Sequence, residues 1–231
     1  MDRGSDVHIR SAPQMLEYLA IVERIAADAP ASILDWGCGF GQMSHLLRQA
    51  GLNVTSFDYG GSDAPDAVVA LERYPDVHAH VASDPRALPY DDASFDAALS
   101  CGVLEHVSDP DASLIELRRV LRPGGTLYVY KLPNRSSYLE WVARRLGMYH
   151  HGMAPDDRLY TPAGARALVA RHGYEICELR LANMLPLSLD APLVQRAKAA
   201  SAIWGASRGL QRLPVLNRLA TNVELVARRS G

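Results

Sequence analysis

Cysteine, long apolar runs and a signal-peptide pattern are scarce or missing in this sequence of 231 residues. Its three cysteines, Cys38, Cys101 and Cys177, are far apart. This spacing excludes a zinc site or disulfide framework and favours free thiols in a reducing compartment. No apolar run reaches the ~18 residues needed to span a bilayer, and the polar start MDRGSDVHIR lacks an apolar signal-peptide core. These absences predict a soluble, cytoplasmic protein.

An excess of charge of one sign is also missing. The 24 basic and 26 acidic residues give a formal net charge of −2. Without a global basic field, we expect neither nucleic acid nor an anionic membrane as a partner. The length suits a single α/β domain, residues 1–231, with a sizeable core.

The most informative stretch covers residues 33–47, ILDWGCGFGQMSHLL. It begins as a buried strand, breaks at Gly37, Gly39 and Gly41, and resumes as an amphipathic helix. Such a unit opens nucleotide-binding α/β folds, because glycine lets a ligand lie against the backbone; a tight turn without a ligand is the alternative. The spacing G-x-G-x-G differs from that of dinucleotide folds. Asp35 at the strand tip suits an ammonium group, which indicates a ligand with an amino acid end.

A second acid follows the next predicted strand. Asp58 lies at the carboxyl end of that strand, beside the strand that carries Asp35. One carboxylate there can accept hydrogen bonds from both hydroxyls of a ribose, because it has two acceptor oxygens. A solvated acid at a strand end is the alternative.

Apolar periodicity predicts that strands and helices alternate along the chain. We expect helices at residues 13–29, 42–50, 64–74 and 111–121 and from residue 161 onward. We expect strands at residues 32–36, 53–57, 77–82, 95–100, 126–131, 174–183 and 222–228. Residues 122–125, RPGG, are expected to form a turn. This alternation predicts a mostly parallel sheet with right-handed crossovers.

Several stretches, in this order and spacing, resemble class I S-adenosylmethionine-dependent methyltransferases. They are DWGCGFG, the acid of SFDYG, ASDPRALPYDDASFDAALS, VLEHV and LRRVLRPGGTLYV, within residues 31–132. Within that family they are similar to the small-molecule branch that contains ubiquinone and menaquinone biosynthesis methyltransferases. The resemblance implies an α/β, Rossmann-like, seven-stranded and mostly parallel sheet with an antiparallel last strand and helices on both faces. It also implies S-adenosyl-L-methionine as the cofactor and a small-molecule acceptor as the partner.

Two regions lie outside this core. Residues 1–30 are expected to form an N-terminal helical cap that packs beside the first strand. Residues 184–220 form a helical insertion between the last two predicted strands, with apolar patches that include Ile203 and Trp204. A substrate lid, a homodimer face and simple packing onto the domain are the three roles open to this insertion.

The resemblance implies a cofactor site at the carboxyl edge of the sheet. Asp58 would bind the ribose with Tyr59 alongside the adenine, and Asp84 would accept a hydrogen bond from the adenine amino group. Pro85 would lie beside the ring; because proline has no N–H, a hydrogen bond commonly made there would be absent or come from Arg86. The methionine end would contact Asp35, Gly37, Cys38, Gly39, Gly41, Cys101 and Gly102. A plain core thiol is the alternative for Cys101.

Methyl transfer to a hydroxyl requires an aligned acceptor and a group that removes the proton. His106, His150 and His151 lie where the family's substrate pocket should open, and an imidazole pKa near ~6.5 suits a base at neutral pH. We therefore predict O-methylation of a phenol, quinol or sugar with a histidine base. For His106 the alternative is a structural role beside Glu105. Acceptor-binding candidates by position are Lys131, Asn134, Tyr138, Arg158 and Tyr160.

Other functions stay open at this point. Some relatives bind a divalent metal with E-x-x-E-H, and here Gly102 replaces the first Glu. Glu105, His106 and one of His150 or His151 could still hold Mg²⁺, although the carboxylate ligands are few. Carbon methylation of a quinone precursor needs little help from a base. The intact set of glycines and acids argues against an inactive scaffold that only binds the cofactor. The glycine spacing argues against a nicotinamide-dependent oxidoreductase.

Overall fold

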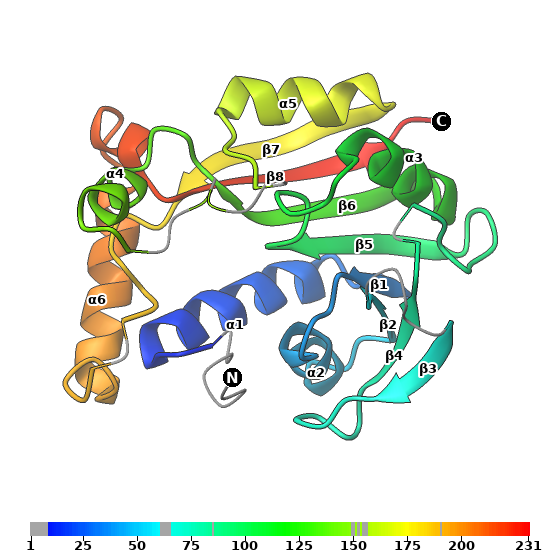
Figure 1. The fold of residues 1–231 in the computed structure, drawn as a ribbon, viewed down its shortest axis with the longest axis horizontal. Coiled ribbons are helices and arrows are strands. Elements are labelled where there is room, and N and C mark those ends of the chain that lie inside the picture. The colour runs from blue at the N-terminus through cyan, green and yellow to red at the C-terminus, as the bar shows by residue number, and fades with distance from the viewer. Residues whose placement is uncertain are drawn as a thin grey trace.

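Eight strands form one sheet in the computed structural model of the chain (Figure 1). This count refers to the residues that the structure describes, which are 9–60, 66–84, 86–148, 151, 153, 157–189 and 191–231. The strands are β1 Ile33–Trp36, β2 Val54–Tyr59, β3 Ala67–Ala70, β4 His78–Ala82, β5 Phe95–Cys101, β6 Leu121–Pro133, β7 Tyr174–Ala182 and β8 Asn222–Arg229. The sequence predicted seven strands, and β3 is the additional one.

The order of the strands across the sheet is β3-β4-β2-β1-β5-β6-β8-β7. The pairs among β4, β2, β1, β5 and β6 are parallel, whereas β8 runs antiparallel to β6 and β7. The sheet is therefore mostly parallel with an antiparallel last strand, as predicted. The strand order reverses beside β1, and α/β proteins bind ligands at the carboxyl ends of strands at such a switch point.

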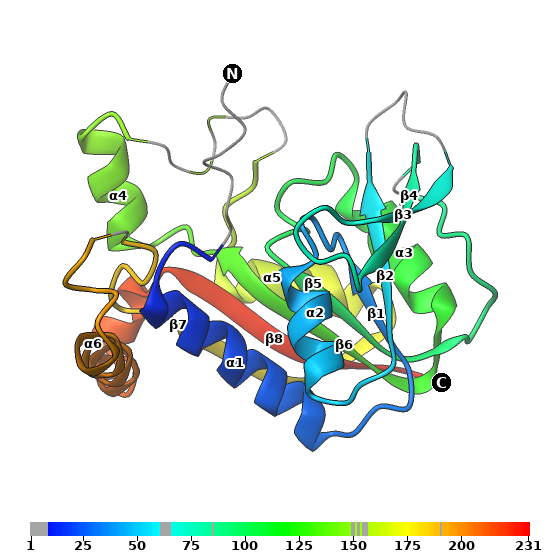
Figure 2. The ribbon, with the colours of Figure 1, turned by 90° about the horizontal axis from the view of Figure 1, so that it is seen from below.

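Helices cover both faces of the sheet. On one face lie α1 (Ala12–Ala27) and α2 (Gln42–Gln49), and on the other lie α3 (Pro110–Val120) and α5 (Pro162–Arg171) (Figures 1 and 2). In β1, Ile33 belongs to the core with α1 and α2, and the next residue, Leu34, belongs to the core with α3 and α5. Because side chains alternate along a strand, a continuous apolar run supplies both cores.

The predicted helix at residues 64–74 is wrong. The described part of this stretch contains β3, which pairs antiparallel with β4. Val68 lies opposite His80, and Val69 lies opposite Ala79. Two adjacent β-branched residues favour a pleated strand, and pairing with β4 outweighs the helical composition of the residues that follow.

The turn predicted at residues 122–125 occurs inside β6. Phe95 pairs with Leu121 and Ala97 pairs with Thr126, so the intervening residues have no partner in β5. Gly124 has a φ angle of 77°, which favours glycine. The predicted turn is therefore a bulge, and the strand continues beyond it to Pro133.

The N-terminal helix and the insertion meet at one end of the sheet. The insertion contains α6 (Ala197–Leu210) and the short 3-10 helix η2 (Leu216–Leu219). The Ala12 N–H donates to Gln195 Oε1 at 2.9 Å, and the Ser11 hydroxyl donates to the Leu187 carbonyl. Figure 2 shows α6 beside the start of α1. Residues 1–8 of the predicted cap lie outside the described residues.

One further helix, α4 (Tyr138–Arg145), follows β6. Ser137 caps it by accepting a hydrogen bond from the Glu140 N–H. Among the described residues, no helix combines the length and the apolar character that crossing a membrane requires.

Candidate functional site

The glycine turn between β1 and α2 has a left-handed backbone. Gly37, Gly39 and Gly41 have φ angles of 76°, 54° and 85°. A Cβ atom on Gly37 would lie 2.5 Å from both methyl groups of Val103, which follows β5. The turn therefore needs glycine both for its conformation and for its close approach to the end of β5.

A cavity of about 770 Å³ lies beside this turn, at the carboxyl ends of β1, β2, β4 and β5. We call it the first cavity. It brings together five residues predicted to bind the cofactor, and a volume of this size suits a small-molecule ligand. These residues are Gly37, Asp58, Tyr59, Asp84 and Gly102.

Two carboxylates line the first cavity in different ways. Asp58 accepts the Tyr59 N–H at 2.8 Å, and burial raises the pKa of Asp58. Asp84 accepts the backbone N–H of Arg86 at 2.9 Å and its Nε–H at 3.0 Å, and these bonds lower the pKa of Asp84. The Arg86 N–H, expected as a donor to adenine, is thus already given to Asp84. Pro85 lies outside the described residues.

Asp35 lies behind the glycine turn and is not part of the cavity lining. It is 2% exposed and accepts a hydrogen bond from the Ser44 hydroxyl at 2.6 Å, while Ser44 Oγ is 2.7 Å from Ser56 Oγ. Burial, and to a smaller extent the charge of Asp58, raises the pKa of Asp35 to about 6. In this position the carboxyl group ties β1 to α2. Cys38, Gly39 and Gly41 are also outside the lining.

A second cavity of about 360 Å³ adjoins the first, and Gly102 and His106 line both. Its walls come from α1, β5, β6 and the insertion. The predicted residues that it brings together are Cys101, Glu105, His106, Lys131 and His151. Two cavities that share wall residues are suited to the transfer of a group between two ligands.

An ion pair lies in the wall of the second cavity. Lys131 Nζ is 3.0 Å from Glu17 Oε2 and 5.0 Å from the centroid of the Tyr18 ring. The Asn183 amide donates to the other oxygen of Glu17. Burial alone would lower the pKa of Lys131, but the charge and hydrogen bond of Glu17, together with Tyr18 and Cys101, raise it more, so the ammonium group stays protonated. Lys131 and Asn183 both have φ angles of 66°, a strained conformation for residues with a side chain.

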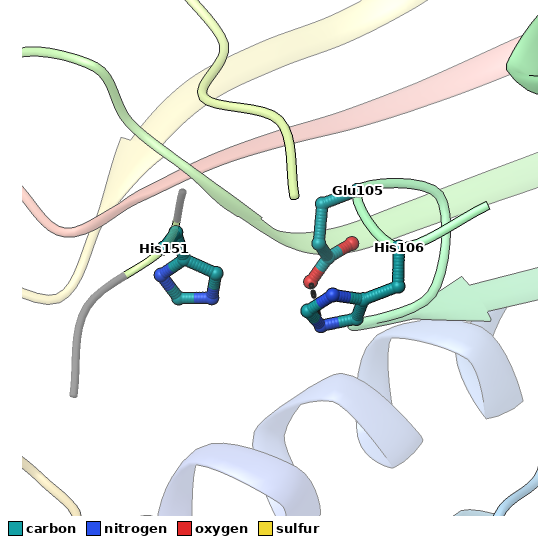
Figure 3. Close-up of side chains that lie close together, drawn as sticks. All are labelled: Glu105, His106 and His151. Carbon is teal, nitrogen blue, oxygen red and sulfur yellow. Dashed lines mark ion pairs between the residues drawn. The ribbon is translucent and has the colours of Figure 1, made fainter. Parts of the chain in front are cut away.

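Three polar side chains gather where the two cavities meet (Figure 3). Glu105, His106 and His151 place ligand atoms within 4.8 Å of one another. His106 Nδ1 is 2.8 Å from Asp157 Oδ1, and His106 Nε2 is 3.8 Å from Glu105 Oε1. His151 Nδ1 is 2.6 Å from Glu140 Oε1. Each imidazole is therefore held at Nδ1 by its own carboxylate.

Glu105 is the buried member of this cluster. It is 2% exposed, and within the described part of the chain its Oε2 has no hydrogen-bond partner. Burial raises the pKa of Glu105 to about 7. Burial lowers the pKa of His151, but its hydrogen bond to Glu140 and the charges of Glu140, Glu105 and Asp157 together raise it more, so the net shift is upward. His150 lies outside the described residues.

Comparison with known proteins places this site in a family. Residues 34–129 match the family model for a methyltransferase domain. The demethylmenaquinone methyltransferase of Renibacterium salmoninarum is 33% identical over 132 residues, which cover 54% of each chain. The ubiquinone biosynthesis O-methyltransferase of Xanthomonas campestris pv. campestris is 32% identical over 154 residues, 60% of this chain and 61% of that protein. The chain thus spans only about half to three fifths of these relatives' length.

A longer match decides the family. A "probable S-adenosylmethionine-dependent methyltransferase" of Mycolicibacterium smegmatis is 30% identical over 184 residues, which cover 71% of this chain and 67% of that protein. The chain belongs to the class I S-adenosylmethionine-dependent methyltransferases. The chain also shares its fold with a SAM-dependent methyltransferase of Thermotoga maritima, with a TM-score of 0.60 at 16% identity over 94% of this chain and 91% of the other.

Several residues predicted to bind the acceptor form hydrogen bonds to backbone carbonyls and do not line the second cavity. The Asn134 amide, which is 0% exposed, donates to two carbonyls at 3.0 and 2.7 Å. The Tyr138 hydroxyl donates to the Met184 carbonyl at 2.8 Å, and the Tyr160 hydroxyl donates to the Leu104 carbonyl at 3.2 Å. Arg158 donates to the carbonyl groups of Val107 and Ser108.

The sequence patterns did not predict three carboxylates of this site, Glu17, Glu140 and Asp157. For Glu17 a signal existed, because it lies four and eight positions before Ile21 and Ile25, which are also buried on α1. A carboxylate on the apolar face of a helix usually has a partner. Glu140 and Asp157 follow no motif, since tertiary folding alone brings them to His151 and His106.

Proposed function

We propose that the first cavity binds S-adenosylmethionine, that the second binds a small hydroxylated acceptor, and that the protein is an O-methyltransferase. The observation that carries this proposal is that Gly102 and His106 line both cavities. Ligands bound in the two cavities would meet at these residues, which suits direct transfer. The bound cofactor supplies an electrophilic methyl group on a positively charged sulfur.

The residues of the first cavity fit this cofactor. Gly37 lines the cavity, and its backbone offers a surface against which the methionine end can lie. Asp58 offers carboxylate oxygens to the ribose hydroxyls. Tyr59, which is 45% exposed, is placed to lie alongside the adenine, and Asp84 to accept from its amino group. Asp35 would act mainly through its charge and by holding Ser44 on α2.

We propose His106 as the base that removes the proton of the acceptor hydroxyl. Because Nδ1 is bound to Asp157, the nitrogen that faces Glu105 and the junction is Nε2. When the hydroxyl oxygen of a bound acceptor takes up the methyl group that the cofactor supplies, the hydroxyl proton would pass to Nε2 of His106. The Asp157 carboxylate would orient the ring and stabilise the imidazolium.

Carbon methylation is the second candidate, because one relative is a demethylmenaquinone methyltransferase. The ubiquinone biosynthesis relative is named as an O-methyltransferase. We favour methylation of oxygen, because two imidazoles lie beside the wall that the cavities share. Each is bound to a carboxylate, an arrangement that suits the removal of a hydroxyl proton.

The insertion at residues 184–220 is proposed to act as a lid on the acceptor. Leu185, Leu187 and Ser188 line the second cavity, which supports this role.

The homodimer stays a prediction. Leu213, Val215 and Leu216 expose apolar side chains that a dimer would cover, and sedimentation of the purified protein tests this.

The test is transfer of labelled methyl from S-adenosylmethionine to pools of phenols, quinols and sugars. We expect label on oxygen, and His106→Gln or Asp157→Asn should lower kcat by about 10²–10⁴-fold without loss of S-adenosylhomocysteine binding. His45→Gln is the matched control, because His45 also pairs with a carboxylate, Asp76, but lines neither cavity. Label on carbon would favour the second candidate. Cofactor binding without transfer to any pool would indicate a scaffold, and undiminished turnover in both variants would remove His106 as the base.

A further inference from the structure

We propose that a third cavity, beside the second, binds an anionic group of the acceptor, a phosphate or a carboxylate, through Arg135 and Arg144. This cavity has a volume of about 380 Å³, and we call it the arginine cavity. Its lining residues are Arg135, Arg144, His151, Asp157 and Leu159. The binding of an anion does not depend on the proposed function, whereas the statement that the anion belongs to the methyl acceptor rests on it.

The arginine cavity continues the second cavity, because His151 lines both. The ring centres of His151 and His106 are 5.9 Å apart (Figure 3). Asp157, in the wall of the arginine cavity, is the carboxylate that lies 2.8 Å from His106 Nδ1. The three cavities therefore form a row that is joined at His106 and at His151. A molecule whose hydroxyl lies at His106 can reach the arginine cavity with a group on its far side.

The charges in the wall of the arginine cavity favour an anion. Within the described part of the chain, no carboxylate pairs with Arg135 or Arg144. Asp157 in the wall and Glu140 on α4 are each paired with an imidazole instead. A guanidinium group can donate two parallel hydrogen bonds to a phosphate or a carboxylate, so two such groups in one cavity suit an anionic ligand.

The backbone that carries Arg135 is fixed at the end of β6. The Arg135 N–H donates to the Tyr160 carbonyl at 2.8 Å, and the Tyr160 N–H donates to the Pro133 carbonyl at 2.8 Å. The buried Asn134 amide donates to two further carbonyls. Two residues that were predicted to bind the acceptor, Asn134 and Tyr160, thus hold the backbone from which Arg135 extends. A backbone held in this way reduces the ordering that a ligand must bring about.

The second arginine is placed by α4. Arg144 lies one turn after Glu140, so the two side chains share a face of the helix. Glu140 accepts a hydrogen bond from the His151 N–H at 3.0 Å, and its Oε1 lies 2.6 Å from His151 Nδ1. One face of α4 therefore holds the histidine that the second cavity and the arginine cavity share, and supplies a guanidinium group to the latter.

These features define the class of acceptor. Arg135 and Arg144 are exposed, so a single ion pair with either would contribute little, and an anion must contact both to bind tightly. The cofactor is not the source of this anion, because the first cavity and the arginine cavity share no lining residue in the described ranges. A neutral phenol or sugar would leave both guanidinium groups in water. The acceptor that fits is a hydroxylated phosphate ester or a hydroxylated carboxylic acid.

Calorimetry of the full-length protein saturated with S-adenosylhomocysteine tests the arginine cavity. Inorganic pyrophosphate serves as the probe for a phosphate ester and succinate as the probe for a carboxylate. We expect one equivalent of pyrophosphate or succinate to bind at low ionic strength and to bind more weakly as salt is added. The probe that binds more tightly identifies the anion. Arg135→Gln and Arg144→Gln should each weaken this binding about tenfold or more.

The matched control is Arg145→Gln. It removes the same charge from the next position of α4, where the Arg145 guanidinium lies 5.6 Å from the centre of the Trp141 ring and does not line the arginine cavity. Arg145→Gln should leave the affinity nearly unchanged. The site is overturned if the folded wild type binds neither probe, if Arg135→Gln and Arg144→Gln bind as well as wild type, or if Arg145→Gln weakens binding equally.

Matched acceptors test whether the anion belongs to the methyl acceptor. Suitable pairs are catechol with protocatechuate, and inositol with inositol monophosphate, since the second member adds only the anionic group. We expect a higher kcat/KM for the anionic member. Arg144→Gln should raise its KM about tenfold with little change in kcat, because binding far from the reacting hydroxyl is lost, and should not affect the neutral member. Equal kcat/KM within each pair would overturn this assignment.

The two measurements separate this proposal from the proposed function. Pyrophosphate or succinate binding that requires both arginines, without methyl transfer to any hydroxyl, would leave the anion site standing and refute the proposed function. Transfer to hydroxyls by a protein that binds neither probe would support the proposed function and refute the anion site.

Discussion

Replacing Gly37 by alanine should destabilise the protein through two separable effects. The φ angle of 76° places the new side chain in the left-handed region, which costs about 1–2 kcal/mol for an L-residue. The new Cβ would also lie 2.5 Å from both Val103 methyl groups, and overpacking of this kind costs about 1–3 kcal/mol. Urea unfolding should therefore show a loss of about 2–5 kcal/mol in the free energy of unfolding.

Two further variants separate these effects. Gly51 has a φ angle of 85°, and no atom lies within 4 Å of the Cβ it would carry, so Gly51→Ala should show the backbone cost alone. Adding Val103→Ala to Gly37→Ala removes the clash, and the double-mutant cycle should give a coupling of about 1–3 kcal/mol.

The result that would refute this reasoning is specific. If Gly37→Ala costs no more than Gly51→Ala and shows no coupling to Val103→Ala, the turn does not press against the end of β5. S-adenosylhomocysteine affinity should fall in the same order as stability, because the turn forms a wall of the first cavity.

Three further perturbations test the site. Asp58→Ala should raise the Kd for S-adenosylhomocysteine at least tenfold, the equivalent of about 1.5–3 kcal/mol, and unchanged calorimetric affinity would remove Asp58 from the site. The pKa of Asp35 in the folded protein is raised to about 6, so the group is protonated below pH ~4 and its burial then costs no ionisation energy. Above pH ~6 the buried carboxylate is ionised, which lowers the free energy of unfolding by about 3 kcal/mol. Asp35→Asn should therefore gain about 3 kcal/mol of stability relative to wild type between those pH values, whereas a pH-independent difference would contradict the burial. Lys131→Met should cost about 3–5 kcal/mol in urea unfolding by leaving Glu17 buried without its cation, and full stability would mean that the pair is dispensable.

Local patterns were sufficient for most of the fold. Isolated apolar runs between glycine and proline, as at β1 and β5, predicted strands because strand formation there needs no distant information. Residues 64–74 failed because alanine, leucine and glutamate follow Val68 and Val69. The pairing partner of these valines, β4, could not be read from the stretch itself.

The site was predictable where one motif holds several of its residues. Gly37 directly follows β1 and Asp58 lies near the end of β2, and both line the first cavity. Acceptor residues depend on side-chain direction, which a sequence does not give. Asn134 and Tyr160 were predicted by their position in the sequence alone, and their polar groups are directed to backbone carbonyls.

The two cavities are encoded by different stretches of the chain. The first is lined within residues 36–108, inside the stretch that matches the methyltransferase family, whereas the second also draws walls from α1 and the insertion. Hydrogen bonds from Ser11 and Ala12 to the insertion join those two walls to each other. If the proposed function holds, exchange of both walls together by recombination should change the acceptor and leave the methyl donor the same.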